Sequence, residues 1–302
     1  MARSIKDYFV LVAKGMGMGA ADVVPGVSGG TIAFIVGIYD ELLNTIKSIN
    51  IKNLRLLLKG DLKAFFTATN AYFLIAILAG IAISILSLAK LITYLLDAHP
   101  VLVWSFFFGL VLASAWFVSK EITRWNFSNI ILFIAGTILA FYITMATPAE
   151  TSSHPLFIFV CGAVAICAMI LPGISGSFIL VLMGKYYYIM EAIKNIDITT
   201  ILIFGAGAFV GITSFSRILS YALSHIRNAT LAILSGFMLG SLNKVWPWKA
   251  QETILSEGHK IRIETNILPE GDWYVALLLM CTGFILVYFI EKFGNQHSQK
   301  NA

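Results

Sequence analysis

The sequence VVPGVSGG at residues 23–30 interrupts an otherwise apolar segment, and ILPGISGS at residues 170–177 interrupts a second one. Proline followed by glycine and serine ends one helix and favours the start of another. The apolar pieces beside each break are short, a pattern typical of discontinuous helices that line a protected cavity at membrane depth. We therefore expect residues 5–48 and 154–195 to form re-entrant helical hairpins, with two full spans joined by a turn as the alternative.

The two breaks belong to an internal repeat. A shift of 147 residues aligns them without a gap and matches ten of twenty-five positions. The shift becomes 127 through the next segment and returns to 147 near the end. The matched pairs include Pro25 with Pro172, Ser28 with Ser175, Gly29 with Gly176, Gly37 with Gly184, Gly80 with Gly207, Ser87 with Ser214, Lys90 with Arg217, Tyr94 with Tyr221, Gly109 with Gly236, Ser114 with Ser241 and Gly136 with Gly283. The chain is thus two copies of one unit.

The composition explains what surrounds these breaks. Of 302 residues, 58% are hydrophobic and 12% charged, against about 45–50% and about 25% in soluble domains. This balance excludes a soluble enzyme, a nucleic-acid-binding domain and a disordered chain. A bilayer needs roughly 20 apolar residues per helix. Six stretches meet that length, at residues 70–97, 100–119, 127–147, 200–224, 228–243 and 273–291.

These elements predict an all-α polytopic membrane protein in which residues 1–149 and 150–302 each contain a re-entrant hairpin and three spans. Three crossings are an odd number, so the two repeats must have inverted topology. With both termini cytoplasmic, the positive-inside rule is satisfied, because twelve basic residues lie inside and five outside. The outer five are Lys194, Lys244, Lys249, Lys260 and Arg262.

Two connecting segments carry their own expectations. The segment 47–66 predicts an amphipathic helix on the inner face, and the outer loop 244–272 contains a candidate β-hairpin at residues 252–265. Neither the five histidines nor the three cysteines have the spacing of a metal site, so no metal ligand and no cofactor is expected.

Basic residues inside apolar stretches are costly and usually face a partner or a wet cavity. Such residues are Lys14, Lys90, Lys185 and Arg217. Lys90 and Arg217 stand in a repeated pattern whose three- and four-residue spacings put a serine, the cation and a tyrosine on one helix face. The two sets are Ser87, Lys90 and Tyr94, and Ser214, Arg217 and Tyr221. Such a face offers donors to an anion, especially a phosphate; the alternative is that the cations reach the membrane interface.

The breaks themselves are the second candidate for an anion site. We expect Pro25 and Pro172 at the first position of a new helix, with the following N–H groups pointing into the cavity. The small residues around them would let a ligand oxygen approach the backbone; these are Ser28, Gly29, Gly30, Ser175, Gly176 and Ser177. Close helix packing is the other use of such glycines. Asp22 either binds a proton or accepts N–H bonds at the first break.

The sequence also resembles a known family. GMGMGAADVVPGVSGGTIAFIVGIYDEL (15–42) looks like the N-terminal signature of the bacterial membrane family catalogued as domain of unknown function 368, and ILPGISGSFILVLMGKY (170–186) matches its second motif. The resemblance covers essentially the whole chain. It implies a polyprenyl-phosphate translocase that recycles undecaprenyl phosphate from the outer to the inner leaflet of the cytoplasmic membrane for cell-envelope synthesis.

Two other functions remain as alternatives. The breaks are also similar to a segment of integral-membrane undecaprenyl-pyrophosphate phosphatases, but Gly29 and Gly176 stand where those have arginine. A transporter of a small soluble anion would have a similar site. Our hypothesis places the lipid phosphate between Ser28 and Ser175, with Lys90 and Arg217 compensating its charge. Coupling to a proton or an ion, and a homo-oligomer packed through small-residue faces, stay open.

Overall fold

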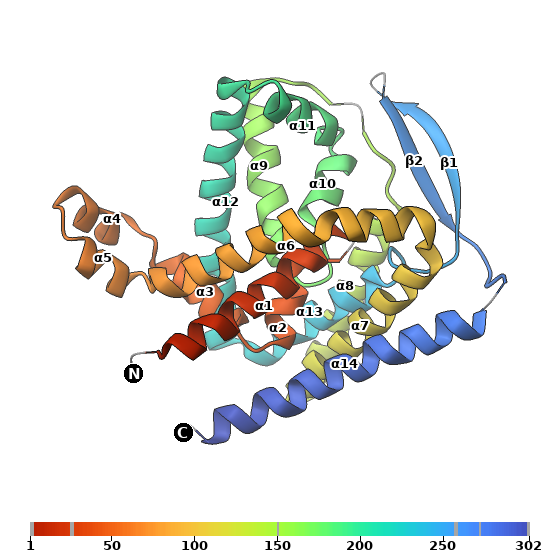
Figure 1. The fold of residues 1–302 in the computed structure, drawn as a ribbon, viewed down its shortest axis with the longest axis horizontal. Coiled ribbons are helices and arrows are strands. Elements are labelled where there is room, and N and C mark those ends of the chain that lie inside the picture. Colours follow the sequence, from red (N-terminus) through yellow and green to blue (C-terminus); the bar gives the residue numbers. More distant parts are fainter. Residues whose placement is uncertain (1–2, 25–26, 150, 257–258, 272, 301–302) are drawn as a thin grey trace.

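The computed structural model describes residues 3–24, 27–149, 151–256, 259–271 and 273–300, so Pro25 lies outside the described residues. The first half forms eight helices in these ranges (Figure 1): α1 Ile5–Val23, α2 Gly29–Ile35, α3 Tyr39–Ser48, α4 Ile51–Leu58, α5 Leu62–Ala68, α6 Ala71–Ala98, α7 Pro100–Lys120 and α8 Phe127–Met145. The second half forms α9 Pro155–Ile170, α10 Gly176–Leu182, α11 Tyr186–Lys194, α12 Ile198–His225, α13 Arg227–Ser241, β1 Lys249–Ser256, β2 His259–Asn266 and α14 Trp273–Lys300.

Both predicted breaks are present, and the short helix that follows each break ends in the same kind of turn. The chain leaves α1 and α9 at the breaks and continues as the short helices α2 and α10, which pack back against α1 and α9. One residue beyond each short helix's C-cap, Gly37 and the equivalent Gly184 have φ values of +69° and +64°. Only glycine adopts this left-handed conformation without strain, which explains why both copies keep it.

The expected position of the second proline was wrong. Pro172 lies in a turn four residues before Gly176, the first residue of α10, and Ser175 is the N-cap. Gly173 follows the proline with a φ of +88°, so the backbone turns once more before it becomes helical.

Five of the six expected spans are helices long and apolar enough to cross a membrane: α6, α7, α8, α12 and residues 273–292 of α14. That the sixth stretch, residues 228–243, crosses the membrane stays a prediction, and its helix is shorter than expected. It forms α13, whose 15 residues reach only about 22 Å at 1.5 Å per residue, against a hydrocarbon core of about 30 Å. The chain beyond α13 is irregular and leads into β1.

The connecting segments differ in how far they follow expectation. The predicted β-hairpin is confirmed: β1 and β2 pair antiparallel from Lys249 opposite Asn266 to Ser256 opposite His259. The segment 47–66 was expected to be one helix, and this was wrong. It is divided between α4 and α5 at Gly60, whose φ of +76° ends the first of them.

The long helices pack in four close pairs, α1 with α6, α9 with α12, α7 with α14 and α8 with α13. A glycine allows each close approach. A Cβ at Gly80 would meet the Val12 carbonyl oxygen, and one at the equivalent Gly207 would meet that of Phe159. The glycine faces anticipated in the sequence therefore pack within the chain.

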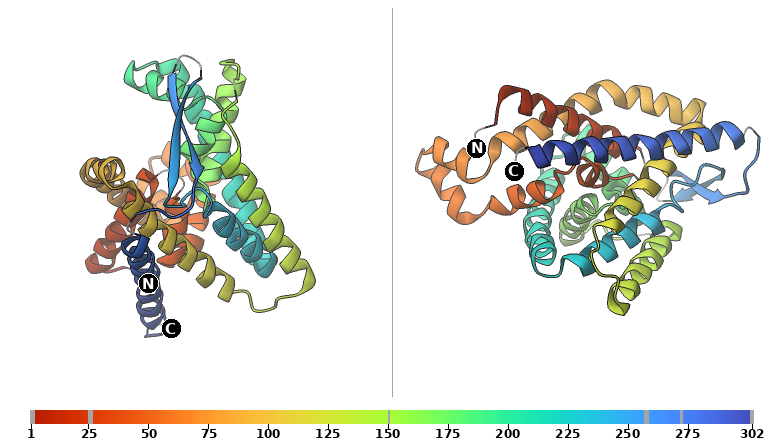
Figure 2. Two further views of the ribbon diagram at one scale, coloured as in Figure 1. Left: turned by 90° about the vertical axis from the view of Figure 1, so that its right-hand side faces the viewer. Right: turned by 90° about the horizontal axis from the view of Figure 1, so that it is seen from below.

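In the last two pairs, a helix of the first half packs against a helix of the second half. Gly109 of α7 lies against α14, and its equivalent Gly236 of α13 lies against α8. Each half thus contributes its final helix to the other half, and the halves interleave (Figures 1 and 2).

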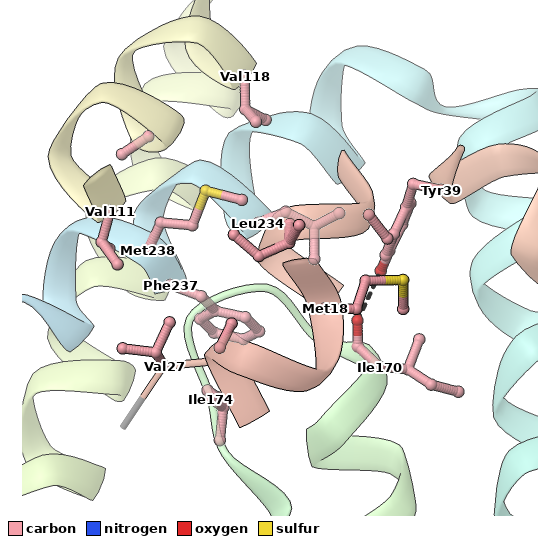
Figure 3. Close-up of a cluster of buried hydrophobic side chains, with 14 of the residues drawn as sticks. Met18, Val27, Tyr39, Val111, Val118, Ile170, Ile174, Leu234, Phe237 and Met238 are labelled. Carbon is pink, nitrogen blue, oxygen red and sulfur yellow. Dashed lines mark hydrogen bonds between the residues drawn. The ribbon is translucent and has the colours of Figure 1, made fainter. Parts of the chain in front are cut away.

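The hydrophobic core surrounds both breaks. Figure 3 shows Val27 from the first break and Ile174 from the second beside Phe237 and Met238 of α13 and Val111 of α7. Each of these side chains is buried. Half of the apolar window of α7 is buried, whereas α8, α12 and α14 expose most of theirs. The breaks therefore lie at the centre of the protein, inside a shell of exposed helices.

Candidate functional site

The two breaks contact each other directly, although about 140 residues separate them. Three hydrogen bonds join them: from Ser28 Oγ to the Met169 carbonyl oxygen (3.0 Å), from Gly173 N to Thr31 Oγ1 (3.0 Å), and from Tyr39 Oη to the Ile170 carbonyl oxygen (3.1 Å). Ser28, Thr31 and Tyr39 are each at most 3% exposed. The last bond is drawn in Figure 3. The breaks thus form a buried, polar seam through the apolar core.

In the first turn of α2, two backbone N–H groups donate to side-chain oxygens. Ser28 Oγ accepts from Gly30 N (3.1 Å), and Asp22 Oδ1 accepts from Gly29 N (2.7 Å). The prediction that Asp22 accepts an N–H bond at the break is therefore confirmed. The second carboxylate oxygen of Asp22 is buried and has no hydrogen-bond partner among the described residues. The N–H group of Gly29 at the start of α2 is therefore already bound by a carboxylate of the chain itself.

The second break differs in its hydrogen bonds. Ser175 Oγ lies 2.8 Å from Ser177 Oγ and makes no cap bond to the backbone of α10. A Cβ added to Gly176 would lie 2.5 Å from the Ala165 carbonyl oxygen, and one added to Gly30 would lie 2.5 Å from that of Ile170. These glycines therefore allow close backbone packing here, which was the alternative to ligand approach.

The two repeated basic faces lie on the surface. Ser87, Lys90 and Tyr94 are exposed along α6. Ser214, Arg217 and Tyr221 are exposed along α12, where the Tyr221 ring stacks on His225 with centroids 4.0 Å apart. The C-terminal half of α6 and the C-terminal half of α12 lie on different sides of the molecule (Figures 1 and 2). The structure therefore brings the predicted break residues together, but not the two cations.

The other two basic residues of the apolar stretches are partly or fully inside the protein. Lys14 Nζ donates to the Val36 carbonyl oxygen (2.7 Å) at the C-terminal end of α2, where a cation complements the helix dipole. Lys185 is 1% exposed, and its Nζ lies 5.9 Å from the centroid of the Tyr188 ring.

Sequence patterns did not reveal an ion-pair network at the start of α3. Glu41 binds Arg3 (2.6 Å), while Asp40 binds Arg227 (3.2 Å), which also binds Glu121 (2.7 Å). Partial burial disfavours the charge of Arg227, but its bonds to Glu121 and Asp40 outweigh this effect and raise its pKa. The partners are 38 to 187 residues apart, so no local spacing indicates them.

A cavity of about 540 Å³ lies between α7, α8, α13 and the base of the β-hairpin. Its walls are mainly apolar and contain none of the predicted site residues. The lining residues are Phe108, Thr137, Ile138, Phe141, Tyr142, Leu239, Gly240, Leu242, Asn243, Trp246 and Asn266. Within the described part of the chain, no three His, Cys, Asp or Glu side chains are grouped to hold a metal ion.

Comparisons with known proteins place the chain in a family of lipid-phosphate translocases. Residues 18–263 match the model of a family described as undecaprenyl phosphate translocase-like. A polyprenyl-phosphate transporter of Vibrio cholerae serotype O1 is 44% identical over 308 residues, covering 98% of this chain and all of the relative. A polyprenyl-phosphate transporter of Staphylococcus aureus is 32% identical, covering 92% of this chain and 94% of the relative. No solved structure matches the chain.

Proposed function

The chain belongs to the undecaprenyl phosphate translocase-like family, and on that basis we propose that it moves polyprenyl phosphate between the leaflets of a bilayer. The direction would be from the outer to the inner leaflet of the bacterial cytoplasmic membrane, returning undecaprenyl phosphate for cell-envelope synthesis. Both relatives that match over nearly their full length are named polyprenyl-phosphate transporters. The abundance of exposed apolar helices is consistent with a lipid substrate that stays partly in the bilayer.

We propose further that the halves are inverted repeats with re-entrant hairpins and that both termini are cytoplasmic. The repeat-related glycine crossings support a pseudo-twofold arrangement. Charge supports the orientation, because Arg3 and Arg227, which the positive-inside rule assigns to the cytoplasm, both pair with acids of one short helix, α3. The β-hairpin then belongs to the outer side.

The single observation that carries the mechanism is the polar seam between the breaks. A phosphate cannot cross hydrocarbon without polar partners, because an unpaired charge there is very costly. The three hydrogen bonds of the seam are neutral and contribute about 0.5–1.5 kcal/mol each, whereas bonds to a charged group contribute about 1.5–3 kcal/mol. When the repeats separate, a phosphate between Ser28 and Ser175 would replace weak bonds by stronger ones. It would reach the backbone at Gly29, Gly30, Gly176 and Ser177 after Asp22 has left Gly29 N and the close contacts of Gly30 and Gly176 have opened.

The exposed basic faces fit the entry and exit of the lipid. In the inverted topology, Lys90 lies toward the outer half of the membrane and Arg217 toward the inner half. Each would attract the phosphate at the lipid-facing surface on its own side, while the isoprenoid tail stays among the lipids. Rocking of the two repeats then alternates the access of the seam.

Hydrolysis is the second candidate, and the geometry of the serines argues against it. A serine nucleophile needs an adjacent base. Ser28 Oγ donates instead to a backbone carbonyl oxygen, and Ser175 Oγ lies against the Ser177 hydroxyl. Neither partner is a general base. Transport of a soluble anion remains the alternative if lipid movement is absent.

Substitution of the basic residues tests the proposal. Lys90→Ala and Arg217→Ala should each abolish transport of undecaprenyl phosphate in proteoliposomes, because each removes the charge on one side. Both residues are exposed, so the folded protein should persist. Lys63→Ala in α5, which is also exposed, is the matched control. Full activity in both variants would remove these residues from the mechanism.

A further inference from the structure

The cavity between α7, α8, α13 and the base of the β-hairpin results from the early end of α13. Under the shift of 127 residues, Ser241 at the end of α13 corresponds to Ser114, but α7 continues as a helix to Lys120. In the second copy the matching residues 242–247 lie outside the helix, and Pro247 among them lacks the N–H group that a continuing helix needs. Three side chains of this segment line the cavity: Leu242, Asn243 and Trp246.

The cavity opens at the exposed surface of α8. Ile138 and Tyr142 of this helix line the cavity, and they are also 50% and 68% exposed. Most of the apolar window of α8 is exposed, so this surface is one that the hydrocarbon of a bilayer covers. An apolar chain can therefore enter the cavity from the membrane without passing through water.

The chemistry of the wall suits an apolar chain better than a phosphate. No charged side chain is among the lining residues that the structure describes. The polar ones bond to other protein groups: Thr137 Oγ1 donates to the carbonyl oxygen of the preceding helical turn (2.8 Å), and Asn266 Nδ2 donates to Asn243 Oδ1 (2.8 Å). Aromatic rings supply much of the remaining surface, with Phe108 packed edge-on against Trp246 at 5.7 Å between centroids.

The last turn of α13 lies between the cavity and the second break. Gly240 lines the cavity, whereas Met238 meets the break, since a Cβ added to Gly173 would lie 2.9 Å from Met238 Cα. Figure 3 shows Met238 in the same buried cluster as Ile174 of this break. Residues two apart point to nearly opposite sides of a helix that is about 10–12 Å across. The break and the cavity are therefore separated by about the width of one helix.

We propose that this cavity holds the isoprene units nearest the phosphate of the transported polyprenyl phosphate, while the phosphate lies at the seam and the rest of the chain stays in the bilayer. This inference rests on the proposed function and deepens it. The volume of about 540 Å³ lies within the range of about 300–1,000 Å³ that is usual for small-molecule sites. In the proposed topology the C-terminal end of α8 is on the outer side, so the cavity takes the lipid from the outer leaflet.

An isoprenoid chain fits this cavity better than the saturated acyl chain of a phospholipid. Each isoprene unit contains a double bond that does not rotate, so binding freezes fewer torsions and costs less conformational entropy. Each unit also carries a methyl branch, which fills a wide cavity more completely than a straight alkyl segment does. The cavity therefore favours the chain of the transported lipid over the chains of the surrounding membrane.

The test fills the cavity and measures binding of farnesyl phosphate, a short polyprenyl phosphate, to the purified full-length protein in lipid nanodiscs. Dodecyl phosphate is the unbranched probe with the same main-chain length. Ile138→Trp should weaken farnesyl phosphate binding about tenfold or more, the factor that corresponds to displacing two methylene-sized groups from an apolar site. The loss for dodecyl phosphate should be smaller. Ile134→Trp, one turn earlier on α8, is the matched control, because Ile134 is 49% exposed and does not line the cavity.

A second variant at the same position separates a filled cavity from a folding defect. Ile138→Ala enlarges the cavity and should keep most of the affinity for farnesyl phosphate. Wild-type affinity in Ile138→Trp would overturn the inference while leaving the proposed function intact. Equal losses for farnesyl and dodecyl phosphate would show a site for any alkyl chain and would also overturn it. If the wild type moves no undecaprenyl phosphate in liposomes, the proposed function fails, and the inference with it.

Discussion

Replacing Ser28 by alanine tests whether the seam between the breaks holds the two halves together. Ser28 Oγ makes two bonds in a site that is 1% exposed: it caps Gly30 N and donates to the Met169 carbonyl oxygen. Loss of an N-cap costs about 0.5–2 kcal/mol. An unpaired buried carbonyl adds about 1–3 kcal/mol. Together, Ser28→Ala should lower the free energy of unfolding by about 1.5–5 kcal/mol.

The equivalent serine is the internal comparison. Ser175 Oγ makes one bond, to Ser177 Oγ, and does not cap its helix. Ser175→Ala should therefore cost about 1 kcal/mol. About 1 kcal/mol shifts the unfolding midpoint by roughly 2–4 °C in a protein of this size class. The expected loss is thus about 3–20 °C for Ser28→Ala and about 2–4 °C for Ser175→Ala.

The assay is thermal unfolding of the purified protein in detergent, followed by circular dichroism at one scan rate for all variants. Ser87→Ala, at an exposed position on α6, is the control and should stay within about 0.5 kcal/mol of the wild type. If Ser28→Ala is no more destabilising than Ser175→Ala, the hydrogen bonds of Ser28 do not contribute the expected stability to the contact between the breaks.

Three other perturbations follow from the packing and the charges. Gly207→Ala should cost about 1–3 kcal/mol in the unfolding assay, because its Cβ would meet the backbone of α9, whereas Gly205→Ala faces open space; equal losses would contradict the crossing. Side-chain and backbone hydrogen bonds from Thr200 lower the pKa of Asp197, so its carboxylate stabilises the fold above pH 3.8. The wild type's advantage in unfolding midpoint over Asp197→Asn should therefore shrink as pH falls below that value, and a constant difference down to pH 2 would refute the cause. Arg227→Gln should cost about 1 kcal/mol or less, since its ion pairs are half-exposed, and this cost should fall in 1 M salt; a cost that salt leaves unchanged would point to packing.

The elements that the sequence predicts best are those with local causes. Proline and glycine at the breaks, and apolar runs of about 20 residues, determine where helices stop and start in α6, α7, α8 and α12. The shortness of α13 has a distant cause. The run 228–243 is apolar and, at 16 residues, close to the length of a span. Asn243 Nδ2, however, donates to Thr144 Oγ1 of α8, and Asn266 at the end of β2 donates to Asn243. No residue near 243 in the sequence indicates these bonds.

In the candidate site, too, contacts between residues that are distant in the sequence could not be predicted. The repeat predicts that Ser28 and Ser175 occupy equivalent places, but the partner of Ser28 is a backbone oxygen 141 residues away. The spacing of Ser87, Lys90 and Tyr94 correctly predicts one shared face. That the face is exposed depends on tertiary packing: α6 turns Gly80 and the buried Ser84 toward α1, which leaves Lys90 outside. Spacing determines which residues share a face but not what that face meets.

If this protein moves a phosphorylated lipid without hydrolysing it, lipid movement and phosphate release can be separated in one experiment. The most direct measurement follows the accessibility of undecaprenyl phosphate in the outer leaflet of proteoliposomes while free phosphate is measured in the same sample. We expect protein-dependent movement of the lipid with no release of phosphate. Phosphate release in step with the protein, above all from the pyrophosphate form of the lipid, or no movement of the lipid at all, would contradict it.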